Sequence, residues 1–202
     1  MSSPDTLICI VDDDASIRTS LLRLLKSAGF TAEAFDSAQA YLDRAAHAGP
    51  SCVVLDVLMP ELTGLGLQQE LVVRGRAEPI VFITGDGDIP ASVQAMKAGA
   101  VDFLSKPFND AEFLDAVNRA LARSLEQRWR HAEREEARVR LAELSPRERQ
   151  VCQGVIAGKM NKEIADDLGT SIRTIKVQRG SVMKKAGVTS VADLVRLINK
   201  AG

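Results

Sequence analysis

Residues 52–60 read CVVLDVLMP, a short apolar run that ends on the carboxylate of Asp56. A strand buried inside a parallel sheet reads as a continuous apolar run. A charged residue at the carboxyl end of such a strand lies where open α/β sheets bind their ligands. Aspartate is also a common turn former, so the interpretation of Asp56 depends on which other charged groups share its edge of the sheet.

The first 120 residues alternate between strand and helix patterns. Apolar runs predict five strands, at residues 7–11, 30–35, 52–55, 80–83 and 101–104. Helical spacing predicts helices after each of them, at residues 16–28, 37–46, 62–73, 90–98 and from 109. This alternation predicts an α/β fold, a parallel sheet with helices on both faces. A flavodoxin-like strand order, 2-1-3-4-5, would place the ligand crevice between the first and third strands.

Polar and charged side chains converge on that crevice. Asp12 and Asp13 end the first strand and Asp56 ends the third, so three carboxylates would repel one another unless a cation lay between them. Mg²⁺ prefers such carboxylate oxygens together with water and phosphate. Thr84 ends the fourth strand and Lys106 follows the fifth. The set predicts phosphoryl transfer to Asp56, because such catalysis consists mostly of positioning and charge neutralisation.

Four blocks of this region resemble the receiver domain of two-component response regulators. They read IVDDD at 10–14, VLDVLMP at 54–60, FITG at 82–85 and KPF at 106–108. The resemblance extends over about residues 6–122. It implies that the aspartate in the second block accepts a phosphoryl group from a histidine kinase.

The same resemblance implies roles for the surrounding residues. Thr84 and Lys106 would contact the phosphoryl oxygens, and the Lys106–Pro107 bond would be cis. The metal would be Mg²⁺ (or Mn²⁺), with Asp12 assisting through water. The implied metal-site residues are Asp12, Asp13, Asp56 and the backbone carbonyl of Leu58.

Phe103 is an aromatic residue in the fifth predicted strand. In receivers an aromatic residue at this position turns inward when the threonine hydroxyl moves toward the phosphoryl group, whereas an isolated strand aromatic would more often be plain core packing. The helix at 90–98 and the strand at 101–104 resemble the surface by which related receivers dimerise. Ile89, Val93 and Phe103 are the expected contact residues.

Two positions are expected to control how long the phosphoryl group persists. Leu58 lies two residues after Asp56, and Asp86 lies two residues after Thr84. In receivers these positions flank the path of the hydrolytic water. The apolar Leu58 is expected to obstruct that water and to prolong the acyl phosphate, while Asp86 adds a negative charge beside the path.

The charge of the chain is distributed unevenly. Residues 1–123 carry a net charge of −7, residues 124–144 are neutral, and residues 145–202 carry +6. A basic carboxyl-terminal part is consistent with nucleic-acid binding, although an ordinary solvated surface is the simpler explanation of charge alone.

The pattern of residues 145–199 predicts four short helices, at 147–157, 162–168, 172–186 and 191–199. Their expected N-caps are Ser145, Asn161, Ser171 and Ser190. Ser145-Pro146-Arg147-Glu148 has the pattern of a capping box. The second and third helices have the spacing of a helix-turn-helix, and the second member carries several basic residues.

Three blocks, LSPRE at 144–148, NKEIA at 161–165 and RTIKV at 173–177, resemble the LuxR-type DNA-binding domain. The resemblance covers about residues 141–200. It implies that two side chains face the major groove, that two lie at or near the DNA backbone, and that the last helix forms a dimer face. Lys176 and Val177 are the residues expected in the major groove, and Thr174 and Arg179 are those expected at the DNA backbone. Val191 and Leu194 are the residues expected on the dimer face.

The segment between the two regions contains strong helix formers and alternating charges. Leu121, Leu125 and Trp129 are spaced by four, and Ala132 and Val139 follow them. Either a coiled coil or a single solvated linker helix fits this pattern, and the sparse apolar stripe favours the linker helix. The predicted domains are a receiver at 1–122, a linker at 123–143 and an output domain at 144–202.

The three cysteines lie in apolar runs without metal-ligand spacing, which predicts buried free thiols in a reducing compartment. The chain begins without the features of a signal peptide and has no apolar stretch of about 18 residues, so a cytoplasmic protein without a membrane span is expected.

Together the two resemblances identify a FixJ-type transcriptional regulator that binds double-stranded DNA when phosphorylated. A cognate sensor histidine kinase, RNA polymerase and a second copy of the chain are the expected partners. No enzyme activity is expected beyond Mg²⁺-dependent phosphorylation and dephosphorylation of Asp56. A dehalogenase-type phosphatase is the alternative, but it needs an aspartate where Leu58 stands. A constitutive DNA binder with an inactive receiver is another, and the intact acidic set argues against it.

Overall fold

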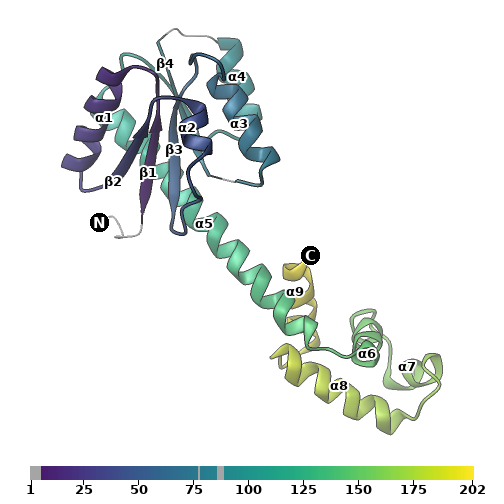
Figure 1. Cartoon of the computed structure of the whole chain (residues 1–202). Coiled ribbons are helices and arrows are strands. Elements are labelled where there is room, and N and C mark those ends of the chain that lie inside the picture. Colours follow the sequence, from purple (N-terminus) through teal and green to yellow (C-terminus); the bar gives the residue numbers. More distant parts are fainter. Residues whose placement is uncertain (1–5, 77, 86–88) are drawn as a thin grey trace. The chain divides into compact units, whose positions relative to one another are not determined.

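The computed structural model describes residues 6–76, 78–85 and 89–202, with no side chains described for 89–91. The chain divides into two compact units after Arg128. The first unit contains a five-stranded parallel sheet with the order β2-β1-β3-β4-β5, as predicted (Figure 1). Its strands are β1 (Leu7–Val11), β2 (Thr31–Phe35), β3 (Ser51–Asp56), β4 (Ile80–Thr84) and β5 (Asp102–Ser105).

The sheet is covered on both faces because alternate residues of its buried strands point to opposite sides. Cys9 and Val11 of β1 pack in the core that the α2, α3 and α4 side chains complete. Ile8 and Ile10 pack in a second core with side chains of α1 and α5. The helices are α1 (Ala15–Ser27), α2 (Ala38–Leu42), α3 (Gly64–Val73), α4 (Ile89–Lys97) and α5 (Asp110–Ala142).

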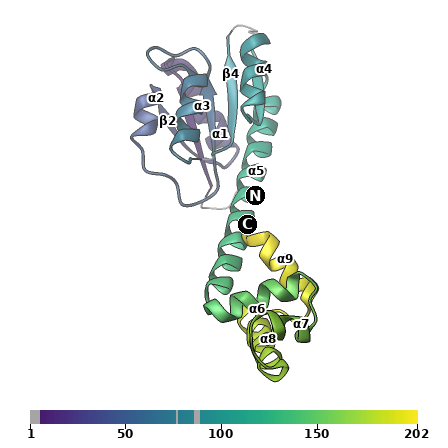
Figure 2. The same cartoon turned by 90° about the vertical axis from the view of Figure 1, so that its right-hand side faces the viewer.

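Several predicted boundaries differ from the structure. Asp56 is the last residue of β3 and not the residue that follows it, because it is still paired in register with Ile83 of β4. Helix α2 ends at Leu42, four residues before the predicted end, and α3 begins at Gly64, where Thr63 supplies the cap. Helix α5 continues without a break from Asp110 to Ala142 (Figure 2).

The second unit contains the end of α5 and four further helices: α6 (Pro146–Ile156), α7 (Asn161–Asp167), α8 (Ile172–Ala186) and α9 (Val191–Ala201). The predicted capping box is confirmed, since the Ser145 hydroxyl and the Glu148 carboxylate each accept the other residue's amide. The expected Asn161 cap is wrong. Met160 occupies that position, and its amide donates to the Glu163 carboxylate at 2.6 Å.

One hydrophobic core holds these helices together. Val151, Ile164, Ile175 and Val182 are buried in it, and Ala137 of α5 packs against the same core. All three cysteines of the chain, Cys9, Cys52 and Cys152, are free and buried, as expected. Within the described residues, no helix combines the length and the apolar character that crossing a membrane requires.

Candidate functional site

Two buried carboxylates lie side by side at the carboxyl edge of the sheet. Val11 of β1 is paired in register with Leu55 of β3, so the residues that follow them, Asp12 and Asp56, are neighbours. Asp12 is 1% exposed and Asp56 is 5% exposed. Two adjacent buried anions repel each other and lose hydration, so they require a positive partner.

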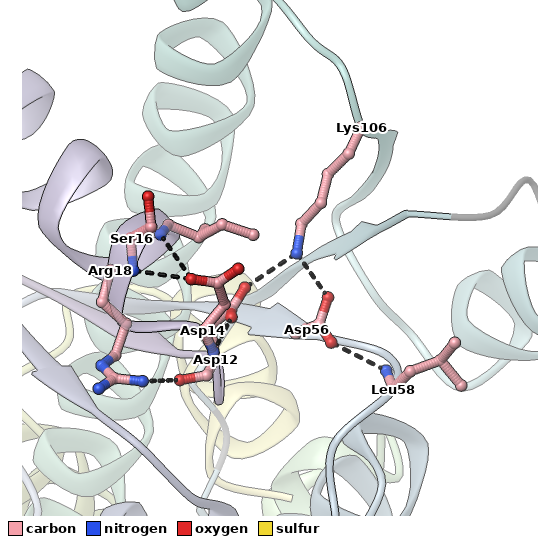
Figure 3. A network of polar contacts seen from close by, with 8 residues as sticks. Asp12, Asp14, Ser16, Arg18, Asp56, Leu58 and Lys106 are labelled. Carbon is pink, nitrogen blue, oxygen red and sulfur yellow. Dashed lines mark hydrogen bonds and ion pairs between the residues drawn. The ribbon is translucent and has the colours of Figure 1, made fainter.

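Lys106 supplies that positive charge. Its Nζ lies 2.9 Å from Asp12 Oδ2 and 2.9 Å from Asp56 Oδ1 (Figure 3). The backbone amide of Lys106 donates to the carbonyl of Thr84 at 2.6 Å, and the Lys106–Pro107 bond is cis, as the resemblance implied. The loop after β5 is thereby held beside β4, which brings the ammonium to the two carboxylates.

The ionisation of the site follows from this pairing. Burial raises the pKa of Asp56 above its ordinary value, and the hydrogen bond from Lys106 partly offsets that effect. Burial acts to lower the pKa of Lys106, but the hydrogen bonds to Asp56 and Asp12 outweigh it and raise that pKa. The arrangement therefore keeps a protonated ammonium next to the Asp56 carboxyl group.

The loop after β3 shapes the other side of Asp56. The amide of Leu58 donates to Asp56 Oδ2 at 3.1 Å, whereas the Leu58 side chain points to solvent and is 61% exposed. The amide of Gly64 donates to the carbonyl of Val57 at 3.0 Å. A Cβ at position 64 would lie 2.2 Å from the carbonyl oxygen of Asp56, so only glycine fits there. Sequence reasoning missed Gly64, although its place at the start of a predicted helix was a signal.

The remaining acidic residues of the first strand end have separate positions. Asp13 is exposed. Asp14 caps α1 by accepting the amides of Ser16 and Ile17, a role that the sequence analysis did not assign. Among the described residues, no three histidine, cysteine or acidic side chains form a group that could hold a metal ion. Carboxylates at positions 12, 13 and 56 and the carbonyl of Leu58 are nevertheless all oxygen donors, the kind that Mg²⁺ prefers.

The two expected switch residues lie on β4 and β5. Thr84 is the last residue of β4 and is 1% exposed. Phe103 is half-buried against the core of the first unit, with its ring centre 6.3 Å from that of Phe82. Asp86, the other residue expected beside the path of water, lies outside the described residues.

The expected DNA-reading side chains are on α8, which Ser171 caps as predicted. Thr174, Lys176 and Val177 are exposed, while the intervening Ile175 is buried in the core. Arg179 is half-buried, and its guanidinium donates to Asn161 Oδ1 of α7 at 3.0 Å.

A second contact, absent from the sequence analysis, holds α8 against α6. The Glu148 carboxylate accepts from Ser181 Oγ at 2.6 Å and from Lys185 Nζ at 2.7 Å. Since Glu148 also accepts the amide of Ser145, one carboxylate joins the cap of α6 to the basic helix α8.

The expected dimer residues have different exposures. Val93 on α4 is exposed and Val191 on α9 is half-buried, while the side chain of Ile89 lies outside the described part of the chain. The expectation for Leu194 is wrong. Its side chain is fully buried in the core of the second unit, so it has no surface to offer to a second copy.

Both units match known families. Residues 8–118 match the response regulator receiver domain, and residues 142–198 match the bacterial regulatory proteins of the luxR family. The chain is 46% identical over 203 residues to nodulation protein W of Bradyrhizobium diazoefficiens, which covers 100% of this chain and 88% of that protein. It is 44% identical over 200 residues to the transcriptional regulatory protein FixJ of Azorhizobium caulinodans, with 98% of this chain and 95% of that protein covered.

Solved structures of similar proteins cover nearly the whole chain. The response regulator StyR matches with a TM-score of 0.86 and 43% identity, over 97% of this chain and 99% of that one. Full-length FixJ from B. japonicum matches with a TM-score of 0.60 and 44% identity, over 100% of this chain and 98% of that one.

Proposed function

Because this chain belongs to the FixJ-type response regulators, in which a receiver domain is joined to a LuxR-type DNA-binding domain, it is a phosphorylation-dependent regulator of transcription, and we propose that Asp56 is its phosphoacceptor. The observation that carries this proposal is the pair of 2.9 Å contacts from Lys106 Nζ to Asp56 and Asp12. We assign the receiver to residues 1–122, the linker to 123–143 and the output domain to 144–202.

In the proposed reaction, a carboxylate oxygen of Asp56 attacks the phosphorus of a phosphohistidine on a sensor kinase. The new O–P bond forms as the P–N bond breaks, and the imidazole nitrogen leaves with the electron pair and takes up a proton. Lys106 offsets the negative charge of the transferred group, because its ammonium already lies within hydrogen-bond distance of the nucleophile. This self-modification is the only chemistry that we assign to the chain.

The oxygen donors at this edge of the sheet fit a magnesium ion. Asp12, Asp13 and Asp56, with the backbone carbonyl of Leu58, would hold Mg²⁺ (or Mn²⁺). The bound ion would neutralise charge on the phosphoryl oxygens. The exposure of Asp13 supports this assignment, since its carboxylate remains open to an ion arriving from solvent.

The response to phosphorylation is assigned to Thr84 and Phe103. The Thr84 hydroxyl would donate to a phosphoryl oxygen, and the ring of Phe103 would turn inward behind it. The surface of α4 and β5 would then favour a homodimer through Ile89, Val93 and Phe103. Contact between Phe103 and the core beneath β4 supports this route, because it links the strand end to that surface.

The output domain would bind double-stranded DNA with α8 in the major groove. Lys176 and Val177 are exposed neighbours on α8, which suits contacts with base edges and thymine methyl groups. Thr174 and Arg179 would contact the DNA backbone. The contact between Arg179 and Asn161 supports that role by holding the guanidinium at the junction of α7 and α8. RNA polymerase is the partner through which a bound dimer would affect transcription.

Incubation with acetyl phosphate and Mg²⁺, followed by intact-mass measurement, tests the phosphoacceptor. Wild type is expected to gain one phosphoryl group and Asp56→Ala none. Asp115→Ala, which removes an exposed carboxylate of α5, is the matched control and should behave as wild type. Equal modification of Asp56→Ala would refute the assignment.

Selection of bound sequences from random DNA, with and without phosphorylation, tests the output. Lys176→Ala is expected to weaken specific binding by about tenfold or more, because a good base contact contributes about 1–3 kcal/mol of discrimination. Lys159→Ala, a basic residue outside α8, is the control. Equal DNA affinity with and without phosphorylation would favour the alternative, a constitutive DNA binder.

A further inference from the structure

Helix α5 carries a row of exposed side chains that the functions above do not use. The row follows intervals of three and four residues, the spacing of a coiled-coil seam. Three of its members are large and apolar: Leu125 is 48% exposed, Trp129 is 72% exposed and Val139 is 62% exposed. We call this row the α5 seam, and it consists of Ala122, Leu125, Trp129, Ala132, Glu136 and Val139.

Another side of α5 already packs within each unit. Within the first unit, Ser124 accepts the amide of Ser51 at 3.1 Å. Within the second unit, Ala137 and Leu141 pack on the core. An α-helix turns by about 100° per residue, so these positions and the seam project from different sides of the helix. The apolar members of the seam therefore form an exposed stripe, and Glu136 within it pairs with Arg140 of the same helix.

The charges beside the seam indicate what covers it. In a parallel coiled coil of identical helices, the residue just before each a position faces the residue five positions later on the other chain. The a positions concerned here are Trp129 and Glu136. This rule sets Arg128 opposite Glu133 of the second copy, and Glu135 opposite Arg140 of the second copy. Both pairs are attractive, and each occurs twice in a symmetric dimer. Charge complementarity thus favours a second copy of this chain in parallel register.

We propose that the α5 seam is a self-association surface on which two copies pair as a short parallel coiled coil, with Trp129 against Trp129 at its centre. The pairing is weak by itself, because Ala132 fills little space and Glu136 meets its own copy as a like charge in the seam. Its dependence on phosphorylation rests on the proposed function. Receivers joined after phosphorylation would raise the effective concentration of the two helices.

Exchanging the charges of Glu135 and Arg140 separates contacts between two copies from contacts within one chain. Glu135 now pairs with Arg138 and Arg140 with Glu136 in the same helix. Glu135→Arg is expected to weaken the phosphorylated dimer about three- to tenfold, as measured by analytical ultracentrifugation. Adding Arg140→Glu should restore the dimer, although it leaves like charges next to each other within each helix. Failure of the double exchange to restore it would overturn the proposal.

The chain has one tryptophan, Trp129, which reports directly on the seam. Pairing should shift its fluorescence to shorter wavelength and protect it from acrylamide when wild type is phosphorylated. At the same protein concentration both changes should be smaller in Glu135→Arg, and both should return to the wild-type size in the double exchange. A phosphorylated wild-type dimer whose Trp129 remains fully quenchable would also overturn the proposal.

Disulfide trapping decides the geometry even if phosphorylation fails. Ala132→Cys, at high protein concentration under oxidation, should form a covalent dimer, since the two Cβ atoms would face each other in the parallel seam. Arg134→Cys, exposed on another side of the same helix, is the matched control and should not. If acetyl phosphate does not phosphorylate wild type, only the assignment of Asp56 as phosphoacceptor is refuted. If Ala132→Cys forms no covalent dimer, or if both cysteine variants are trapped equally, the proposed pairing along the α5 seam is refuted.

Discussion

Replacing Gly64 with alanine is expected to disturb the phosphoacceptor although residue 64 carries no charge. The new Cβ would lie 2.2 Å from the carbonyl oxygen of Asp56 and 3.1 Å from its carbonyl carbon, whereas ordinary contacts begin at 3.4 Å. The shortfall of about 1 Å falls on backbone atoms, which cannot move aside as a side chain can. The end of β3 must therefore shift relative to α3.

The magnitude follows from that displacement. Overpacking of a filled site costs about 1–3 kcal/mol, and a misplacement of about 1 Å at a reacting group can lower a rate by about 100-fold. We expect Gly64→Ala to be phosphorylated by acetyl phosphate about 10- to 100-fold more slowly than wild type. Hydrogen exchange in peptides that contain Ser51–Asp56 should increase in parallel, because the same clash destabilises β3.

Gly66→Ala is the matched control on the same helix. A Cβ at that position would meet the end of the Leu62 side chain at 2.7 Å, and a leucine terminus can rotate away. Its phosphorylation rate should remain within about twofold of wild type. Wild-type rates for both variants would show that the backbone of Asp56 tolerates the displacement, and the reasoning from the short contact would be wrong.

Leu58→Asn is expected to shorten the acyl-phosphate lifetime several-fold, since an amide would replace an exposed apolar side chain beside the path of water; an unchanged dephosphorylation rate would contradict this. Ser124→Ala removes the buried partner of the first amide of β3, and hydrogen exchange should show a loss of about 1–3 kcal/mol. Gly180→Ala introduces a Cβ with no atom within 4 Å, so urea unfolding of the output domain should show a gain of up to about 1 kcal/mol. The hydrogen bond from Lys185 and its neighbours lowers the pKa of Glu148 from 4.5 to about 2. The stability that charged Glu148 contributes is therefore fully present above pH 4.5 and is lost as the pH falls toward 2; thermal melts of Glu148→Gln should lack this component.

Much of the first unit could be predicted from residue patterns. Apolar runs predicted β1, β3 and β4, because a strand buried on both faces admits few polar residues. The less buried β2 and β5 were predicted from their place in the alternation of strands and helices. The expected strand order alone predicted that Asp12 and Asp56 lie at one edge of the sheet. The cap of α6 was equally predictable, since Ser145 and Glu148 act within a single turn of chain.

Contacts between distant elements could not be predicted in this way. Leu194 was expected on a dimer surface, but it packs into the core of its own unit. Helical spacing shows that a face is apolar and does not show whether the chain itself or a second copy covers it. Asn161 was expected to cap α7 and instead accepts a hydrogen bond from Arg179 of α8, a partner 18 residues away.

The sequence by itself determined the α/β alternation, the acidic strand ends and the basic helix-turn-helix, because each depends on residues that are close along the chain. Only the tertiary structure decided how those residues meet. It brought Lys106 to two carboxylates that lie 50 and 94 residues away along the chain, and it placed Gly64 against the backbone of Asp56. It also left the α5 seam exposed. The physical reason is that burial and charge pairing depend on distances in space, which strand register and helix packing set together.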